Sequence, residues 1–362
     1  MIINTITDFL NFFFYKLFEN LFLIKSEKKN TLIINNLYLG DIIAQIDFIH
    51  TYSKINGTHK TYFICRKEYS LFISRLLPEL KIIPYDDKKY RFNVVFRFRF
   101  LRRINSLSVL KVVNLNQERG AHSEQIATLN TAVHRYCISG SEFYLRLFKE
   151  FYNKKYQKIL CEGVYNEYKK INILYKYFNI PPLELTFKKF HKEKNFSLPA
   201  KYIVVAPFAL NGNRDYDFQK FIKIFKFFID KKFVLLGTKQ QTIRIKSQLP
   251  DNVINLVGKT TLVDAFLITI QASMFIGLDS GLSHLAILAR KKALLIIGGG
   301  NFGRFFPFET RENSILYFFY NLDCFNCRWN CIYEKKYCLE FIKTNDICKG
   351  IEILEQDNLL TE

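Results

Sequence analysis

The residues best suited to chemistry in this sequence lie in one short segment, Asp279-Ser-Gly-Leu-Ser-His284. It follows an apolar run, Met274 to Leu278, and precedes a stretch with helical spacing, Leu282 to Ala289, so we expect a strand, a polar turn and a helix. The start of a helix offers N–H groups and partial positive charge to an anion, and the small Ser280 and Gly281 leave room for a phosphate group. The alternative interpretation is an ordinary strand–turn–helix unit in which the aspartate caps the helix.

The elements that would position this segment repeat through the second half of the sequence. Apolar runs that end at a glycine or proline alternate with helical stretches, which favours a parallel, doubly wound sheet. The predicted strands are Tyr202–Ala206, Phe233–Leu236, Val253–Leu256, Met274–Leu278 and Ala293–Ile297, and the predicted helices are Asp217–Lys231, Gln240–Leu249 and Leu262–Gln271. In open α/β sheets ligands bind beyond the carboxyl ends of the strands, where the Asp279 turn is expected.

The first half shows the same alternation, and a linker separates it from the second. The predicted strands are Lys29–Asn35, Thr61–Cys65, Ile82–Ile83 and Phe92–Phe98, and the predicted helical stretches are Ile42–Ile55, Tyr69–Leu77 and Glu142–Asn179. Pro181, Pro182 and a charged run to Lys194 are typical of a linker. We predict an α/β protein with two Rossmann-like, doubly wound parallel-sheet domains that face a cleft. Their expected bounds are 29–195 and 196–322, with an apolar helix at 1–28 and a cysteine-rich tail at 323–362.

Composition narrows the classes of partner. The chain has 362 residues and a net charge of +20, so we expect anionic partners such as acidic lipids or phosphorylated sugars. It has no zinc-finger spacing, RNP-like motif or basic heptad region, so nucleic acid is not an expected partner. No apolar run reaches the length of a membrane-spanning helix.

The N-terminal segment, Ile2 to Ile24, is apolar but carries Asp8, Lys16 and Glu19, and it does not resemble a signal peptide. Its large apolar residues recur at helical spacing: Phe9, Phe12, Phe13, Leu17, Leu21 and Phe22. One interpretation is a helix packed on the body of the protein. The other is a helix that lies on an anionic membrane surface.

Cysteines gather near the C-terminus. Cys324, Cys327, Cys331 and Cys338 are closely spaced, and Cys348 follows them, whereas the other three of the eight are scattered. Four thiolates at this spacing suit a tetrahedral structural zinc ion. Reduced thiols, disulfides and an iron–sulfur cluster are the alternatives.

Three motifs together carry a resemblance to a known family. Gly40-Asp41 follows the first predicted strand, Leu256-Val-Gly-Lys-Thr260 follows a later one, and a helix then separates it from the Asp279–His284 segment. This order resembles glycosyltransferase family 9, the lipopolysaccharide heptosyltransferase family, over roughly residues 30 to 310. The resemblance implies the GT-B fold.

The resemblance also implies an activity, the inverting transfer of a sugar from a nucleotide diphosphate donor. Asp41 matches the family's general base, although a helix-capping role is the alternative. Amides of residues 281–284 would stabilise the leaving diphosphate without a metal ion. The residues expected at the donor are Arg214, Thr260, Thr261, Asp279, Ser280, Gly281 and His284.

One departure from the family pattern concerns the nucleotide. Relatives usually carry a glutamate after the strand that ends at Gly237, and this chain has Thr238-Lys-Gln-Gln241 instead. An adenine nucleotide is therefore a first hypothesis only. Gly298-x-Gly300-x-x-Gly303 matches a dinucleotide fingerprint, but too short a segment follows for the usual helix, so we interpret it as a loop near the donor sugar.

The acceptor side is expected in the first half. Val94 to Phe100 alternates apolar and basic residues on a predicted strand, which suits an acceptor with phosphate or carboxylate groups, or else an exposed strand face. The candidates are Gly40, Arg97, Arg99, Arg102 and His122. We expect a lipid-linked or lipopolysaccharide-type glycan acceptor and a cytoplasmic, peripheral position on the inner membrane. The alternatives are a non-catalytic nucleotide-sugar-binding or scaffold protein, and a membrane module organised by the cysteine tail.

Overall fold

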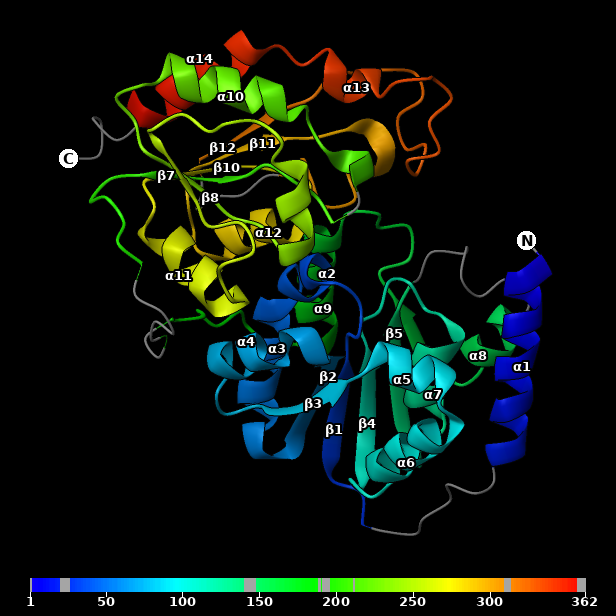
Figure 1. Cartoon of the computed structure of the whole chain (residues 1–362). Helices are drawn as coiled ribbons and strands as arrows, with labels where there is room; N and C mark the ends of the chain where they lie inside the picture. The colour runs from blue at the N-terminus through cyan, green and yellow to red at the C-terminus, as the bar shows by residue number, and fades with distance from the viewer. Residues whose placement is uncertain are drawn as a thin grey trace. The chain divides into compact units, whose positions relative to one another are not determined.

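The computed structural model describes residues 2–19, 27–139, 148–187, 190, 196–210, 212–308 and 314–356, with the side chains of residues 2–8 and 213 left aside. The chain forms two compact units, Met1–Lys189 and Phe190–Glu362. Each unit is built on its own parallel sheet (Figure 1).

The sheet of the first unit has six strands in the order β3-β2-β1-β4-β5-β6. The strands are β1 Asn30–Ile34, β2 Thr61–Arg66, β3 Lys81–Tyr85, β4 Val109–Asn114, β5 His134–Ile138 and β6 Lys158–Leu160. Ile33 of β1 is paired with Phe63 of β2 on one side and with Val113 of β4 on the other. The strand order reverses between β1 and β4, and the carboxyl ends beside such a switch point are the usual ligand site of this fold.

Helices cover both faces of the first sheet. They are α1 Ile2–Phe18, α2 Leu39–Ile43, α3 Ile46–Asn56, α4 Lys67–Leu76, α5 Asp87–Phe92, α6 Val94–Asn105, α7 Ala121–Thr128, α8 Lys149–Asn153 and α9 Glu167–Phe178, with a 3-10 turn at Thr58–Lys60. On one face α3 packs on α9 through Phe48, Tyr52 and Phe178. In Figure 1, α1 lies at the side of this unit, next to α8.

The second unit repeats the same topology in the order β12-β11-β10-β7-β8-β9. Its strands are β7 Ile203–Ala206, β8 Phe233–Leu235, β9 Val253–Asn255, β10 Met274–Leu278, β11 Ala293–Ile296 and β12 Ile315–Phe318. Its helices are α10 Phe218–Phe227, α11 Leu262–Gln271, α12 Gly281–Leu288, α13 Tyr337–Glu340 and α14 Thr344–Gln356, with 3-10 turns η2 Gly212–Arg214, η3 Lys239–Arg244 and η4 Gly299–Asn301. The switch point here lies between β7 and β10.

The C-terminal helix α14 belongs to the second unit because it packs into the core of that unit. Ile347, Ile351 and Leu354 on one face of α14 are buried with Phe221 and Phe225 of α10. Full burial of each such side chain contributes about 1.5–3 kcal/mol. Figure 1 shows α10 and α14 on one face of this sheet and α11 and α12 on the other.

The expected α/β architecture is confirmed, and the strands and helices of the second half lie close to their predicted positions. One helix is misjudged there, because the predicted Gln240–Leu249 is only the 3-10 turn η3, which ends at Arg244. In the first half, the predicted helix Ile42–Ile55 is broken at Ala44 and Gln45 into α2 and α3.

The predicted strand Phe92–Phe98 is wrong, because this segment forms α6. The Asn93 side chain accepts a hydrogen bond from the Phe96 N–H and caps the helix. Arg97, Phe100, Leu101 and Ile104 are then buried together at helical spacing. The alternation of phenylalanine and arginine resembled the two-residue period of a strand. In the helix, some of these phenylalanines lie at the border of the buried face and are only partly buried.

The long helical stretch predicted at Glu142–Asn179 is also wrong in its described part. It contains α8, then strand β6, then α9, and its residues 142–147 lie outside the described residues. Strands β4 and β5 were not predicted, although β4 lies at the centre of the sheet.

The N-terminal helix α1 packs on the first unit through one face. Phe14 and Tyr15 are buried, and the Phe12 ring stacks on Phe148 with centroids 4.0 Å apart. Among the predicted apolar positions, Leu21 and Phe22 lie outside the described residues. In the described part of the chain, no helix is long and apolar enough to span a membrane.

Candidate functional site

The strand–turn–helix segment predicted to bind an anion has the expected form. Strand β10 ends at Leu278, Asp279 and Ser280 form the turn, and α12 begins at Gly281. Ser280, not Asp279, occupies the N-cap position, and its side chain makes no capping hydrogen bond. Among the described residues, its buried Oγ has no hydrogen-bond partner. The first amides of α12 and this hydroxyl therefore lie together at the carboxyl edge of the sheet.

His284 lies one turn into α12 and is buried between aromatic rings. The ring centroids of Phe305 and Phe306 lie 4.6 Å and 4.8 Å from that of the imidazole. Burial, together with the positive charges of Arg304 and Arg214, lowers the pKa of His284 from 6.5 to about 3. The imidazole is therefore neutral at physiological pH, so it can form hydrogen bonds but carries no positive charge.

Arg214 brings a positive charge to the same turn. It lies in η2, after β7, and its Nη1 is 3.9 Å from Asp279 Oδ2 and 3.5 Å from the Asp279 carbonyl oxygen. Because β7 and β10 are neighbours at the switch point, the segments that follow them meet. The Arg214 side chain is about one-third exposed, so its guanidinium is open to solvent and to a ligand.

The two threonines of the predicted site differ in environment. Thr261 is the N-cap of α11, and its Oγ1 accepts the Asp264 N–H in a reciprocal capping box, so the structure gives it a helix-capping role. Thr260 is half-buried beside it. Gly258 adopts a φ of +75°, and a Cβ there would lie 3.1 Å from Lys239 Cα, so this turn needs a glycine.

Gln241 is a residue of this region that the sequence did not identify as a site residue. It is buried, and its Nε2 donates to the Ala209 carbonyl at 2.8 Å. Arg244 Nη1 donates to the same carbonyl at 2.8 Å. Both residues therefore fix the loop after β7 that leads to Arg214.

The glycine-rich run after β11 is confirmed as a loop. Directly after Gly298 the chain forms the short 3-10 turn η4 and not an α-helix, and Gly298, Gly299 and Gly300 face aromatic rings from the cysteine segment. A Cβ on Gly298 or Gly300 would overlap the Trp329 ring, and one on Gly299 would overlap Phe325. The absent side chains make room for protein rings, which accounts for the glycines without a dinucleotide.

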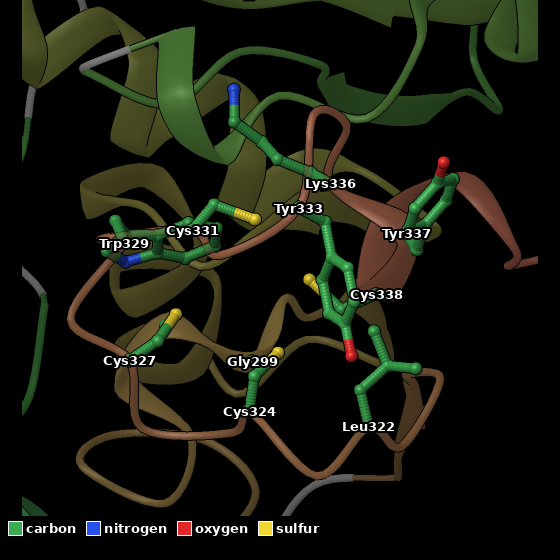
Figure 2. A pocket seen from close by; sticks show the side chains of 11 residues that line it. Gly299, Leu322, Cys324, Cys327, Trp329, Cys331, Tyr333, Lys336, Tyr337 and Cys338 are labelled. Carbon is green, nitrogen blue, oxygen red and sulfur yellow. The ribbon is translucent and has the colours of Figure 1, made fainter.

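The cysteine segment folds against this loop. Cys324, Cys327, Cys331 and Cys338 line one cavity with Trp329, Tyr333 and Tyr337 (Figure 2). Burial raises the pKa of Cys324 and Cys338, and the neighbouring thiols raise it further. All eight cysteines are free. The donor set suits zinc or iron, yet in the described part of the chain no three such side chains are placed to hold a metal ion.

In the first unit, Asp41 lies on the first turn of α2, directly after β1, and is buried with Gly40. The carboxyl ends of β1 and β4 carry buried asparagines. The Asn36 N–H donates to Asn116 Oδ1 at 3.0 Å, and Asn116 Nδ2 donates to Asn114 Oδ1 at 2.8 Å. Asn35 Nδ2 donates to the Asp41 carbonyl at 3.1 Å.

A buried ion pair completes this polar group and was not predicted. Arg119 Nε donates to Glu124 Oε1 at 2.7 Å, and the Tyr156 hydroxyl donates to Glu124 Oε2 at 2.8 Å. Arg119 Nη2 is buried and has no hydrogen-bond partner among the described residues. Arg119 lies three residues before the predicted His122 and was the only sequence signal for this pair. Tyr156, whose ring centroid lies 4.8 Å from the Arg119 guanidinium carbon, is distant in sequence and could not be identified from it.

The predicted acceptor residues do not form one group, because only Arg97 and His122 among these described residues are in contact. Arg97 is buried, and it donates to the carbonyls of Tyr90 and Arg91 and to Asn11 Oδ1, so it holds α1, α5 and α6 together. His122 Nε2 lies 3.5 Å from Arg97 Nη2, and burial lowers its pKa to about 3. These two residues serve the packing of the unit.

Arg99 and Arg102 lie on the exposed face of α6. This helix leads back from the carboxyl end of β3 toward the amino end of β4, and Ser108, just after it, accepts hydrogen bonds from the N–H groups of Lys29 and Asn30 at the start of β1. Arg102 therefore lies toward the amino ends of the strands, whereas Asp41 lies at their carboxyl ends.

Two six-stranded parallel sheets of this order, each flanked by helices, are the architecture of the GT-B class of glycosyltransferases. The chain belongs to glycosyltransferase family 9 (heptosyltransferase), whose model matches residues 148–333. The earlier resemblance is thereby confirmed.

Solved structures show the same fold. A family 9 glycosyl transferase from Veillonella parvula DSM 2008 has a TM-score of 0.71 at 15% identity, covering 92% of this chain and 99% of that one. The E. coli ADP-heptose lipopolysaccharide heptosyltransferase II has a TM-score of 0.67 at 14% identity, covering 91% and 99%. The iron-containing dodecameric glycosyltransferase TibC from enterotoxigenic E. coli H10407 has a TM-score of 0.54 at 16% identity, covering 92% and 78%. A search of curated proteins found no match.

Proposed function

We propose that the protein is an inverting glycosyltransferase that moves a heptose or related sugar from an ADP-linked donor to a lipopolysaccharide-type or other cell-surface glycan. The observation that carries the proposal is the anion-binding arrangement at the start of α12, where Arg214, Asp279 and Ser280 meet. Family membership supports the reaction class. Two solved relatives support the donor, because one E. coli heptosyltransferase is described with ADP and TibC with ADP-D-β-D-heptose.

The donor diphosphate would bind at this arrangement. As the bond between the anomeric carbon and the diphosphate breaks, negative charge develops on the leaving phosphate oxygen. The α12 amides and the Arg214 guanidinium are fixed before the reaction and stabilise this charge without a metal ion. A neutral His284 can donate or accept one hydrogen bond there, and we assign the rest of the donor set to Thr260 and Thr261 at the start of α11.

Asp41 is the proposed general base. The acceptor hydroxyl attacks the anomeric carbon from the face opposite to the diphosphate, and its proton passes to the Asp41 carboxylate. Burial of Asp41 just after β1, with its backbone carbonyl accepting a hydrogen bond from the buried Asn35 side chain, supports this role. Attack from the opposite face inverts the anomeric configuration.

A structural metal ion is a separate part of the proposal. Cys324, Cys327, Cys331 and Cys338 line one cavity and are the candidate ligands for zinc or iron, and their thiols would have to move together to hold the ion, because no three of these described residues are placed to do so as they stand. Such an ion would crosslink the segment that seats Trp329 on the glycine loop and would take no part in sugar transfer. Elemental analysis of the purified protein and of its Cys327→Ser variant tests this. About one ion per chain in the wild type, lost in the variant, supports a site, and a metal-free native protein refutes it.

The activity is tested by ADP release from ADP-heptose, measured with and without a lipopolysaccharide acceptor. Acceptor-dependent release that Asp41→Asn abolishes is the expected result. Tight donor binding with no release under any acceptor would instead support a nucleotide-sugar-binding scaffold. Cofractionation with the inner membrane would test the proposed position at its cytoplasmic face.

A further inference from the structure

Helix α1 presents a continuous row of large apolar side chains to solvent. Phe9, Leu10, Phe13 and Leu17 are between 57% and 69% exposed. They follow one another at helical spacing, so they form a single face of the helix. Isolated exposed apolar residues are common on soluble proteins, but a row of four on one helix indicates a binding surface.

The opposite face of α1 is fixed to the first unit, so the row cannot turn inward. Tyr15 is buried against Phe151 and Tyr152, with ring centroids 5.2 Å and 5.5 Å away. Gln125 of α7 donates to the Asn11 carbonyl at 3.0 Å. Rotation of the helix to bury the row would break these contacts.

A second exposed apolar group adjoins the row. Phe92 is 83% exposed, and Val94 and Val95 are also exposed at the junction of α5 and α6. Arg97 joins the two groups, because its Nη1 lies 3.0 Å from Asn11 Oδ1 and its Nη2 lies 2.8 Å from the Arg91 carbonyl oxygen. The middle of α1 and the end of α5 therefore lie side by side.

Arginines accompany these apolar residues. Arg99, Arg102 and Arg103 are on the exposed face of α6, and no ion pair joins them to an acidic side chain in the described part of the chain. Helix α6 is packed against α1, since the Phe18 and Phe98 rings lie 5.6 Å apart. We name this set the α1–α6 surface: Phe9, Leu10, Phe13, Leu17, Phe92, Val94, Val95, Arg99, Arg102 and Arg103.

We propose that the α1–α6 surface binds an anionic lipid bilayer. Apolar side chains that enter the acyl boundary and arginines that pair with lipid phosphates are the two requirements for an interfacial helix. A second copy of the chain is a poorer occupant, because two such surfaces would bring like charges together. This deepens the proposed membrane position by naming the surface, and lipid binding is measured without sugar transfer, so the two proposals can fail separately.

The test is sedimentation of the full chain with vesicles of phosphatidylcholine, alone or mixed with phosphatidylglycerol. We expect binding to the mixed vesicles only, with loss on addition of salt. The Phe9→Ser/Phe13→Ser variant should bind the mixed vesicles at least about tenfold more weakly, because each ring that enters the bilayer buries apolar surface. Arg99→Gln/Arg102→Gln/Arg103→Gln should bind roughly a hundredfold more weakly to anionic vesicles.

The matched control is Phe227→Ser/Ile229→Ser, which removes comparably exposed apolar residues of the second unit and should leave binding unchanged. Circular dichroism and the melting temperature show whether each variant is folded. Equal binding to neutral and anionic vesicles, or wild-type binding in a folded Phe9→Ser/Phe13→Ser variant, would overturn the proposal. Light scattering could also overturn it, by showing that the wild type is a dimer and that the Phe9→Ser/Phe13→Ser variant is a monomer with unchanged lipid binding. The α1–α6 surface would then join two copies of the chain.

Discussion

The guanidinium of Arg214 lies 3.9 Å from the carboxylate of Asp279, although 65 residues separate the two in sequence. The sheet brings them together, because β7 and β10 are adjacent and parallel and their carboxyl ends share one edge. The charge of Arg214 is thereby held beside the first turn of α12. The proposed donor site depends on this relationship.

Replacement of Arg214 by alanine should weaken nucleoside diphosphate binding by roughly 10- to 100-fold, the value of a charge-assisted hydrogen bond. Asp279→Ala should weaken it as well, because Arg214 would lose the neighbour that orients it. Titration calorimetry measures both. Lys223→Ala removes one exposed positive charge of α10 in the same unit and should leave the affinity unchanged. Equal losses in Arg214→Ala and Lys223→Ala would mean that only net charge matters.

Asp41→Asn should lower the rate of sugar transfer by roughly 10²- to 10⁴-fold, the usual contribution of a general base. Donor affinity should be unchanged, since Asp41 belongs to the first unit and the proposed donor residues to the second. Steady-state rates and donor dissociation constants separate the two effects. Asp47→Asn is the matched control, because Asp47 also lies in the first turn of a helix, α3, but is exposed. Near-normal turnover in Asp41→Asn would leave Asp41 with a structural role only.

His284 predicts a pH dependence of stability. Its pKa falls from 6.5 to about 3 on folding, so between these values the unfolded chain binds a proton that the folded protein does not. Stability from this residue is therefore complete above pH 6.5 and is lost progressively as the pH falls toward 3.

Urea unfolding of the wild type and of His284→Gln between pH 3 and 6.5 measures this loss of stability. The free energy of unfolding of the variant should depend less steeply on pH. His122 has a similar shift and accounts for part of the slope that is left. His59→Gln, at an exposed position, should match the wild type. Parallel curves for wild type and His284→Gln would contradict a buried neutral imidazole.

Gly300→Ala should destabilise the second unit by about 1–3 kcal/mol, because the added methyl overlaps the Trp329 ring. Trp329 is the single tryptophan of the chain, so its fluorescence reports the displacement directly. Gly120→Ala is the control, since a Cβ there meets nothing within 4 Å. Unchanged emission and stability in Gly300→Ala would show that the ring does not pack on this loop.

The strand, turn and helix of the proposed donor site could be predicted from sequence because their signals are local. Met274 to Leu278 is an unbroken apolar run of strand length, and the polar turn Asp279-Ser280 and the helix follow within a few residues. The hydrophobic period changes at the same place as the structure does. Nothing distant in the chain is needed to define this element.

The rest of the fold and of the candidate site depends on contacts between residues that are distant in sequence. Whether Arg97 faces solvent or the core is decided by Asn11, 86 residues earlier, which accepts its hydrogen bond. The alternation of Val94 to Phe100 alone could not reveal this. Likewise, the hydrogen bond between Tyr156 and Glu124 depends on the order of β4, β5 and β6 in the sheet. Strands β5 and β6 have too few strongly apolar residues to be recognised as strands from the sequence.

The central claim is that the start of α12 binds a nucleoside diphosphate, and Trp329 fluorescence tests it most directly. The Trp329 ring centroid lies 5.8 Å from the Arg214 guanidinium carbon, so a ligand on Arg214 should change its emission. Titration with ADP, GDP, UDP and CDP should give a saturable change that occurs at the lowest concentration with ADP, and Asp279→Ala should move it to higher ADP concentration. No change with any of the four in folded protein, or an equal change in Asp279→Ala, would contradict a donor site at this turn.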